Sequence, residues 1–247
     1  MSRAHTSPLV ALALLVLFPS CLRSQSLPPN PPAGDLLFSD DFSHGLANWT
    51  TELEAGGSVT ATSGTLTIDV PAGASVWFKP LLTGPVVIKY DATVINNGGP
   101  NDRVSDLNCF WMARDARSPA NIFGWKRSGT FADYNQLLTY YVGVGGNTNT
   151  TTRFRRYVGD PIGRPLRPGD DLQDAADLLV PNKPQQILLV ANGNVIQFYR
   201  DKKKLFEMND PKPYTSGWFA FRTTHSHLAI TNFCIYKLPK AAAAAAP

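Results

Sequence analysis

The sequence predicts an all-β domain, specifically a two-sheet antiparallel jelly-roll sandwich with long loops over one face. Most of its informative segments are short, rich in β-branched and aromatic residues, and bounded by Gly, Pro, Asn or Asp. No segment keeps the period of about 3.6 residues that marks a helix, apart from a short turn near 172–179. Many short strands separated by turns are typical of sandwiches and jelly rolls.

The expected strands follow one another through the middle and end of the chain. In order they are 65–70, 75–80, 86–94, 107–113 and 138–144, then "QILLVA", "VIQFYR", "GWFAFRT" and "HLAITNFCIYKL". The turn "ANGN" between "QILLVA" and "VIQFYR" predicts a tight hairpin, and "RDKKK" marks a second turn. Two long excursions, 114–136 and 159–184, interrupt this pattern, and loops of such length usually serve a function or cover a site.

The first 26 residues predict an export signal. Arg3 and His5 precede an apolar run at 9–18, which is shorter than the ~20 residues that a membrane span needs. Two outcomes stay open: cleavage after Ser26, or lipidation of Cys21 as in bacterial lipoproteins. We therefore expect a secreted or periplasmic protein, with a lipid anchor as the alternative and without a membrane span.

The rest of the chain divides into three parts. We expect a Pro-rich linker at 27–35, the jelly roll at 36–238 and a disordered Ala-rich tail at 239–247. After export only Cys109 and Cys234 remain, and an oxidising compartment would permit a bridge between them. The alternative is that both are small buried residues of core strands.

Composition and missing motifs narrow the function. The net charge of +4 is spread thinly, and no polybasic tail suggests nucleic acid as a partner. The chain has no G-x-S-x-G, H-E-x-x-H or C-x-x-C motif and no nucleotide loop, so nucleophilic serine or cysteine chemistry finds no support. We expect no cofactor and no catalytic metal, although acidic turns such as 39–41 could hold a structural calcium.

The main functional signal is the segment "YYVGVGGNTNTTTRFRRYVG" at 140–159, which carries three arginines and no acidic residue. On a strand, Arg153 and Arg155 face one side while Arg156 faces the other. The segment could present its donors to an anionic or polyhydroxylated ligand. Alternatively, its arginines could pair with aspartates elsewhere in the fold.

These residues suit β-elimination better than hydrolysis. Hydrolysis normally needs two positioned carboxylates, and the three glutamates of the chain form no E-x-D-x-E pattern. Elimination from a uronate needs a group that neutralises the sugar carboxylate, together with a base and an acid. The arginine fork fits a carboxylate, and tyrosine or histidine fits the base and the acid.

The candidates therefore fall into two groups. The candidate catalytic residues are Tyr140, Tyr141, His225, His227 and Arg155. The candidate substrate-binding residues are Arg153, Arg156, Asn147, Asn149, Arg103, Asp106, Trp125, Arg127, Tyr134 and Arg222. Only one of the two adjacent tyrosines can line a shared cleft. The histidines of "RTTHSH" could instead be ordinary surface residues, and no third ligand is evident that would complete a metal site with them.

Two stretches resemble known families. "FSDDFSHGLANWT" followed by "GGSVTATSGTLTIDV" is similar to the entry of a concanavalin A-like (lectin/glucanase) jelly roll. "GGPNDRVSDLNCFWMARD", "RSGTFADYNQLLTYYVGVGGNTNTTTRFRRY" and "YTSGWFAFRTTHSHLAI" resemble a bacterial domain family of unknown function, numbered 6250, that is related to the YesU-like proteins. The likeness covers nearly all of 40–238. Lysines at 202–204 replace the glycine of the family's "YRDG"-like turn, so a strict type I′ or II′ turn is not expected there.

The resemblance implies a fold, and it implies a context because the family occurs among exported proteins of polysaccharide-degrading bacteria. It implies no catalytic roles. We expect a monomeric, carbohydrate-active protein with a polysaccharide or oligosaccharide as its partner. Our first hypothesis is a lyase-like enzyme acting on an acidic glycan. The alternatives are a non-catalytic, lectin-like module and an enzyme that processes keto-sugars.

Overall fold

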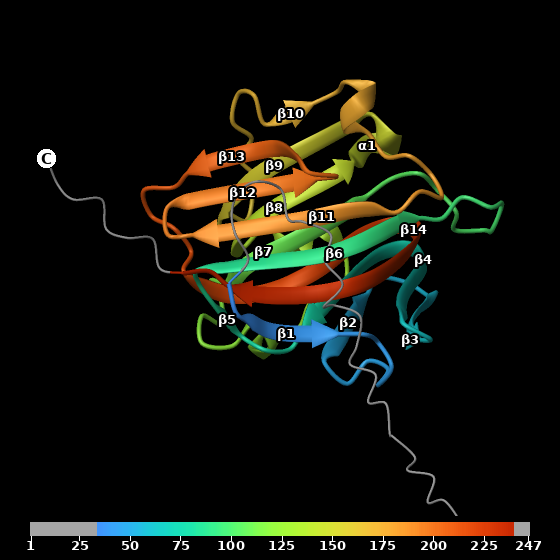
Figure 1. Ribbon diagram of the computed structural model, residues 1–247, viewed down its shortest axis with the longest axis horizontal. Helices are drawn as coiled ribbons and strands as arrows, with labels where there is room; N and C mark the ends of the chain where they lie inside the picture. Colours follow the sequence, from blue (N-terminus) through green and yellow to red (C-terminus); the bar gives the residue numbers. More distant parts are fainter. Residues whose placement is uncertain (1–33, 240–247) are drawn as a thin grey trace, which may run out of the picture.

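The computed structural model describes residues 34–239, and antiparallel strands dominate it (Figure 1). The strands are β1 (Leu36–Asp40), β2 (Trp49–Leu53), β3 (Ser58–Thr62), β4 (Thr65–Phe78), β5 (Leu82–Thr83), β6 (Val86–Val94), β7 (Leu107–Asp115), β8 (Leu137–Gly145), β9 (Thr151–Val158), β10 (Asp171–Leu172), β11 (Gln185–Asn192), β12 (Val195–Arg200), β13 (Lys203–Asn209) and β14 (Ser216–Lys237). The helical turns are η2 (Ile122–Gly124), η3 (Phe131–Tyr134), α1 (Gly146–Asn149) and η4 (Ala175–Asp177). The predicted signal and most of the predicted linker and tail lie outside the described residues.

The long strand β14 joins two layers, as the predicted sandwich requires (Figure 1). Its first half lies between β7 and β4, and its second half lies between β6 on one side and β4 and then β1 on the other. One layer runs β10-β9-β8-β7-β14, and the other runs β14-β6-β11-β12-β13. All these pairings of β14 are antiparallel. No helix among the described residues is long and apolar enough to cross a membrane.

The main core fills the space between the layers. Because side chains alternate along a strand, each strand sends every second residue into this core. Trp49 lies near its centre, with ring centroids 5.2 Å from Phe78, 5.2 Å from Phe221 and 5.0 Å from Phe233. Its indole N–H donates to Asp40 at 2.8 Å, so the buried polar atom is satisfied.

A second aromatic cluster lies on the outer face of the β9-β8-β7-β14 layer. Trp77, Phe110, Tyr134, Tyr141 and Tyr157 are all buried in it, under the loop that follows β7. The long excursion predicted at 114–136 is therefore packed onto the sheet. It covers only part of this outer face, and the remainder stays open to a ligand.

The two hairpins at the end of the second layer have two-residue turns. Asn192 pairs with Val195 across the predicted turn of β11 and β12. The next turn was expected not to be of type I′, and that expectation was wrong: Asp201 and Lys202 both have positive φ, at 49° and 71°. Positive φ at both central residues is what a type I′ turn requires, and here it forms without glycine.

No bridge joins Cys109 to Cys234, because Cys109 is a free, buried thiol. In the sheet register Cys109 lies opposite Phe221 on β14, whereas Cys234 lies opposite Lys89 on β6, so different strand neighbours surround them. Burial raises the pKa of the Cys109 thiol to about 12, which keeps it protonated and unreactive.

Candidate functional site

An open cleft occupies the part of the outer face that the aromatic cluster leaves uncovered. It has two lobes, with volumes of about 150 Å³ and 250 Å³, which share Asp106 and Phe131; we call it the Asp106 cleft. The first, which we call the arginine lobe, is lined by Tyr141, Gly143, Gly146, Asn147, Thr151, Arg153, Arg155 and Arg164. The second, which we call the Glu54 lobe, is lined by Glu54, Asn108, Thr130, Ala132, Arg222 and Thr224.

Strand alternation explains why these side chains gather. Tyr141 on β8 lies opposite Arg155 on β9, and Gly143 lies opposite Arg153, so all four positions share one face. The absence of a side chain at Gly143 leaves space in the lobe, because a Cβ there would lie 2.6 Å from the Tyr141 hydroxyl and 3.2 Å from the Asn108 side-chain oxygen. Any larger residue would push into the floor of the arginine lobe.

The cleft holds positive charge that the protein itself does not neutralise. None of the ion pairs within residues 34–239 includes Arg155, Arg164 or Arg222. Arg155 donates to the backbone carbonyl of Arg164, and burial lowers the pKa of Arg155 from its ordinary value. Arg222 is 2% exposed and donates to the carbonyl of Gly129 at 2.5 Å. Arg155 is half-buried and Arg222 is buried, and guanidinium groups of this kind without carboxylate partners favour an anionic ligand; the exposed Arg164 adds charge beside them.

Two further arginines near the cleft are compensated. Arg153 forms an ion pair with Asp171 of β10 at 2.9 Å, yet its Nε atom is buried without a hydrogen-bond partner. Arg103 pairs with Asp106 at 2.5 Å and donates to the carbonyl of Thr224 at 2.7 Å, which ties the loop before β7 to β14. Both alternatives for the segment 140–159 therefore apply in part: Arg153 and Arg156 pair with aspartates, and Arg155 does not.

Asp106 lies where the two lobes meet. Its φ is +60°, an uncommon value outside glycine, and its carboxylate accepts from Arg103, from the Ser105 hydroxyl at 2.7 Å and from the Asn108 amide at 3.3 Å. Asn108 is 4% exposed, and its side-chain oxygen has no partner among the described residues. An unpaired buried acceptor is uncommon in proteins, and a ligand hydroxyl would satisfy it.

Tyr141 supplies a proton donor at the same place. Its hydroxyl makes no hydrogen bond to any residue between 34 and 239. Burial is the main cause that raises its pKa well above 10.0; the interactions with Tyr157 and Asp106 also raise it, and Arg222 and Arg155 act in the opposite direction. The phenol is therefore protonated at neutral pH, and it can donate a hydrogen bond or a proton but is a poor base.

Tyr140 and Arg156 lie on the other face of the same two strands. The Tyr140 hydroxyl donates to the buried carboxylate of Asp210 at 2.7 Å, and Arg156 donates to the same oxygen at 2.6 Å. The guanidinium of Arg156 also lies 4.3 Å from the ring centre of Tyr214. Neither residue lines the Asp106 cleft, and their contacts join β8 and β9 to the loop before β14.

The two histidines of "RTTHSH" also lie outside the lining of the cleft. His227 forms a contact of 2.8 Å with Asp102, and the exposed His225 lies 3.4 Å from the carbonyl of Pro100. His225 contributes to the site only through its backbone carbonyl, which accepts from Arg103 at 2.9 Å. Neither imidazole therefore lies where the predicted catalytic histidine was expected.

Arg127 and Tyr134 belong to a buried network beneath the loop that follows β7. Arg127 pairs with Glu52 at 2.8 Å and with Asp115 at 2.9 Å, and the Tyr134 hydroxyl donates to Glu52 at 2.7 Å. Breaking such a network would leave buried charges without partners. Both residues hold the loop on the sheet and do not reach the cleft.

Asn149 and Trp125 also lie apart from the cleft lining. The amide of Asn149 bonds to both the N–H and the carbonyl of Leu179, at 2.8 Å and 3.0 Å, and so holds the turn between β8 and β9. Trp125 is 45% exposed, and the guanidinium of Arg117 lies 4.6 Å from its ring centre. Its position leaves it as an isolated surface platform.

Among the cleft residues that sequence reasoning missed, three have charged or amide side chains. Glu54 follows β2, Asn108 lies in β7, and Arg164 lies in the loop after β9. Arg164 could have been suspected because the excursion at 159–184 flanks the arginine-rich segment. Glu54 and Asn108 carry no such signal, because only the folded sheet brings them to the cleft that Arg155 of β9 also lines.

The described residues show no group of three or more His, Cys, Asp and Glu side chains arranged around a metal position. The acidic turn at 39–41 has protein partners for its carboxylates: Asp40 accepts from the indole of Trp49, and Asp41 accepts from Ser43. These hydrogen bonds give the two aspartates a turn-capping role.

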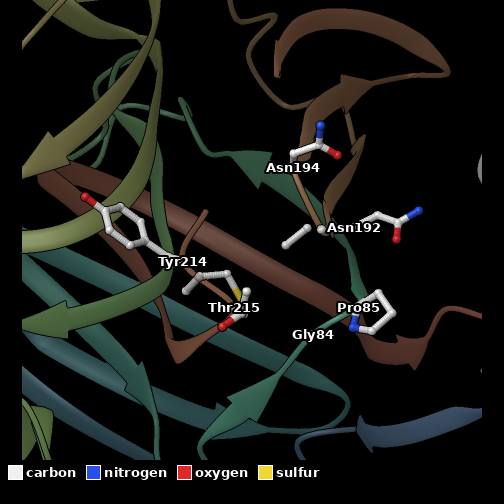
Figure 2. Close-up of a pocket in the computed structure, with 9 residues that line it drawn as sticks. Gly84, Pro85, Asn192, Asn194, Tyr214 and Thr215 are labelled. Carbon is white, nitrogen blue, oxygen red and sulfur yellow. The ribbon is translucent and has the colours of Figure 1, made fainter. Parts of the chain in front are cut away.

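A second hollow of about 290 Å³ lies at one end of the sandwich. Figure 2 shows Asn192 and Asn194 on one side of it and Tyr214 and Thr215 on the other, with Gly84 and Pro85 below. The side chains of Asn192 and Tyr214 point away from each other, and none of the lining residues is charged. Because no polar groups converge there, the Asp106 cleft is the stronger candidate site.

Comparison with solved structures places the fold among jelly rolls. A protein of unknown function with a galectin-like fold from Bacillus subtilis matches at a TM-score of 0.64 and 16% identity, covering 83% of this chain and 97% of that chain. The carbohydrate-binding module CBM66 from Bacillus subtilis matches at 0.51 and 11%, covering 78% and 97%. An endo-β-1,3-glucanase from Pyrococcus furiosus matches at 0.55 and 10%, covering 83% and 95%. At these identities the likeness shows the fold, and it confirms the predicted fold class.

Sequence comparison gives a family and no characterised relative. No protein with a curated description matches the chain. The family match extends from residue 68, in β4, to residue 233, near the end of β14, and includes most of the Asp106 cleft. The chain therefore belongs to the family described as Domain of unknown function (DUF6250).

Proposed function

We propose that this protein binds an acidic polysaccharide in the Asp106 cleft and cleaves it by β-elimination. The observation that carries the proposal is the convergence of Arg155, Arg164 and Arg222, none of them in an ion pair among the described residues, on a cleft that also holds Tyr141. A sugar carboxylate would neutralise this charge through bidentate hydrogen bonds.

The class of ligand is supported by the fold and sharpened by the charge. Two of the similar structures are described as a carbohydrate-binding module and an endo-β-1,3-glucanase, so this fold serves sugar polymers in other proteins. A neutral glycan would leave the three arginines without counter-charge, whereas a uronate supplies it. An acidic polysaccharide outside the cell would also agree with the export signal predicted at the amino terminus.

The chemistry follows from the positions of the remaining polar groups. The guanidinium of Arg155 stabilises the negative charge that develops on the uronate carboxylate as the adjacent C5 proton is removed. Asp106, which lines both lobes, takes that proton, and the electron pair forms the C4–C5 double bond. The C4–O bond then breaks, and the Tyr141 hydroxyl gives its proton to the leaving glycosidic oxygen. Water restores the proton to Tyr141 and removes it from Asp106.

A non-catalytic, lectin-like module is the second candidate, and one observation favours it. His225 and His227 lie outside the cleft lining, and the raised pKa of Tyr141 excludes a phenolate base. Only a carboxylate of the cleft is left as the base, and Asp106, the one that lines both lobes, already accepts three hydrogen bonds. If Asp106 serves only to orient Arg103 and Asn108, the cleft binds an acidic glycan without cleaving it.

The test is to incubate the protein with a panel of uronic acid polysaccharides and follow the ultraviolet absorbance of the unsaturated uronate. Arg155→Ala is the cleft variant, and Arg167→Ala is the control, because Arg167 belongs to the next loop, pairs with Asp170 and does not line the cleft. We expect absorbance to rise with the wild type and with Arg167→Ala but not with Arg155→Ala. Affinity for one glycan without any absorbance change would instead support the lectin-like module. The absence of both binding and cleavage with every glycan of the panel would contradict the proposal.

A further inference from the structure

We infer that the cleft recognises the reducing end of its acidic glycan, so that the sugar in the arginine lobe is the last unit of the chain. This inference rests on the proposed function, and it concerns how the chain lies in the cleft. It depends on three features: a bridge over the arginine lobe, the closure of that lobe towards β10, and the position of Asp106 between the lobes.

The bridge is made by the two long loops. Arg164, from the loop after β9, lies with its guanidinium 4.5 Å from the ring centre of Phe131, from the loop after β7. The backbone carbonyl of Arg164 accepts from Arg155, whose side chain rises from the face of β9 below. Both Phe131 and Arg164 line the arginine lobe. The loops therefore meet above Arg155 and limit the lobe from that side.

Other contacts close the lobe further. The ion pair of Arg153 with Asp171 connects β9 to β10 at the outer edge of the layer. Towards the opposite ends of β8 and β9, the aromatic cluster around Tyr157 and Phe110 fills the face. The lobe holds about 150 Å³, below the range of roughly 300 to 1,000 Å³ that is typical of whole ligand pockets. This space suits a single sugar unit, and we therefore place the end of the chain there.

The Glu54 lobe offers the way out. It shares Asp106 and Phe131 with the arginine lobe, and its own lining includes Glu54 and Thr224. A chain whose last unit sits in the arginine lobe would extend across β7 and β14 through this second lobe. The bond between its last two units would then lie beside Asp106 and within reach of the Tyr141 hydroxyl.

The chemistry of elimination fixes which end is bound. The bond that breaks is the C4–O bond of the uronate whose carboxylate the arginines hold, and the leaving sugar is attached on its non-reducing side. If that uronate occupies the closed lobe, nothing follows it on its reducing side, so it is the reducing-end unit. The released product is then an unsaturated monosaccharide, and the shortened chain departs with a new reducing end.

The test uses size-graded oligosaccharides of galacturonate, guluronate and glucuronate, each with its reducing end intact or reduced to the alditol by borohydride. Binding is measured by calorimetry with the Asp106→Asn variant, so that chains are not cut. We expect the affinity per chain to stay constant as chains grow longer and to fall about tenfold or more on reduction of the end, the equivalent of about 1.4 kcal/mol. Among products of the wild type, the unsaturated monosaccharide should appear from the first turnovers.

A variant pair tests the bridge itself. Arg164→Ala removes the side chain that meets Phe131, and Arg167→Ala removes a charge from the same loop without touching the cleft. We expect Arg164→Ala, and not Arg167→Ala, to lose the penalty for a reduced end and to gain affinity with chain length. If the protein with Arg164 in place binds longer chains more tightly, or binds reduced and intact ends equally well, end recognition is overturned and the proposed function still stands. Absence of binding to every acidic glycan would overturn the proposed function, and this inference with it.

Discussion

The two faces of the β8-β9 hairpin carry the same kinds of residue and use them differently. Tyr140 and Arg156 face one way, and there the buried carboxylate of Asp210 satisfies both. Tyr141 and Arg155 face the other way, where no described carboxylate pairs with the arginine and the phenol has no partner. The two tyrosines are neighbours in the sequence, and so are the two arginines.

This difference separates groups that stabilise the fold from groups that wait for a ligand. A buried charge with its partner in place contributes to a unique structure, and removing the partner is costly. A half-buried charge without a partner stabilises nothing in the free protein, and its desolvation is offset only when a ligand arrives. The comparison therefore predicts opposite responses to substitution on the two faces.

The largest effect is expected at Tyr141. Tyr141→Phe removes the proposed proton donor and should lower the turnover by a factor of about 10² to 10⁴. The free energy of unfolding should change by less than about 1 kcal/mol, because the hydroxyl has no hydrogen-bond partner to lose. Turnover and denaturant unfolding of the purified variant test both parts, and unaltered turnover on a cleaved glycan would remove Tyr141 from the mechanism.

The opposite pattern is expected at Asp210. Asp210→Ala leaves Arg156 and Tyr140 without their shared acceptor and should lower the free energy of unfolding by about 3 kcal/mol. Urea unfolding followed by tryptophan fluorescence measures it. The affinity of the remaining folded protein for glycan should be unchanged, and a specific loss of affinity at full stability would contradict the assignment of the two faces.

Arg155→Ala is expected to cost affinity without costing stability. Loss of a charge-assisted hydrogen bond should weaken glycan binding by about 1.5 to 3 kcal/mol, or roughly ten- to hundredfold. The free protein should be as stable as the wild type or slightly more stable, because Arg153 and Arg164 repel the charge of Arg155. Calorimetry at low and high salt tests the binding, which should weaken as salt screens the charges. A large loss of stability would show that Arg155 belongs to the structural set.

Tyr140→Phe is the matched counterpart of Tyr141→Phe and should have a smaller effect. It removes a hydrogen bond to a buried carboxylate and should lower the free energy of unfolding by about 2 kcal/mol. Turnover should stay at the wild-type value because the side chain does not line the cleft. Comparing the two variants in the same assays isolates the effect of strand face from that of residue type.

The smallest effect is a pH dependence of stability at Asp210. Burial by itself would raise the pKa of Asp210, but hydrogen bonds from Arg156 and Tyr140 outweigh it and lower the pKa below 3.8. The carboxylate therefore stabilises the fold above pH 3.8, and this contribution is lost as the pH falls through the lowered pKa. The stability difference between the wild type and Asp210→Asn should shrink in that acid range. A difference that grows on acidification would contradict this sign.

The sequence by itself determined the fold class and the division of the arginines between two faces. β-branched and aromatic segments with regular turns specify strands, and a period of two residues places Arg153 and Arg155 together whatever the tertiary structure is. Local turn chemistry was less decisive, since Asp201 and Lys202 adopt positive φ without glycine.

Only the tertiary structure decided which face carries the site and which residues complete it. Glu54, Asn108 and Arg222 come from segments far apart in the chain, and the fold brings all three to one lobe of the cleft. The same packing supplies Asp210 to Tyr140 and withholds a carboxylate from Arg155. Alternation along a strand is a local property and can be read from the sequence. The partner that meets each side chain depends on contacts between distant segments, which form only when the layers pack.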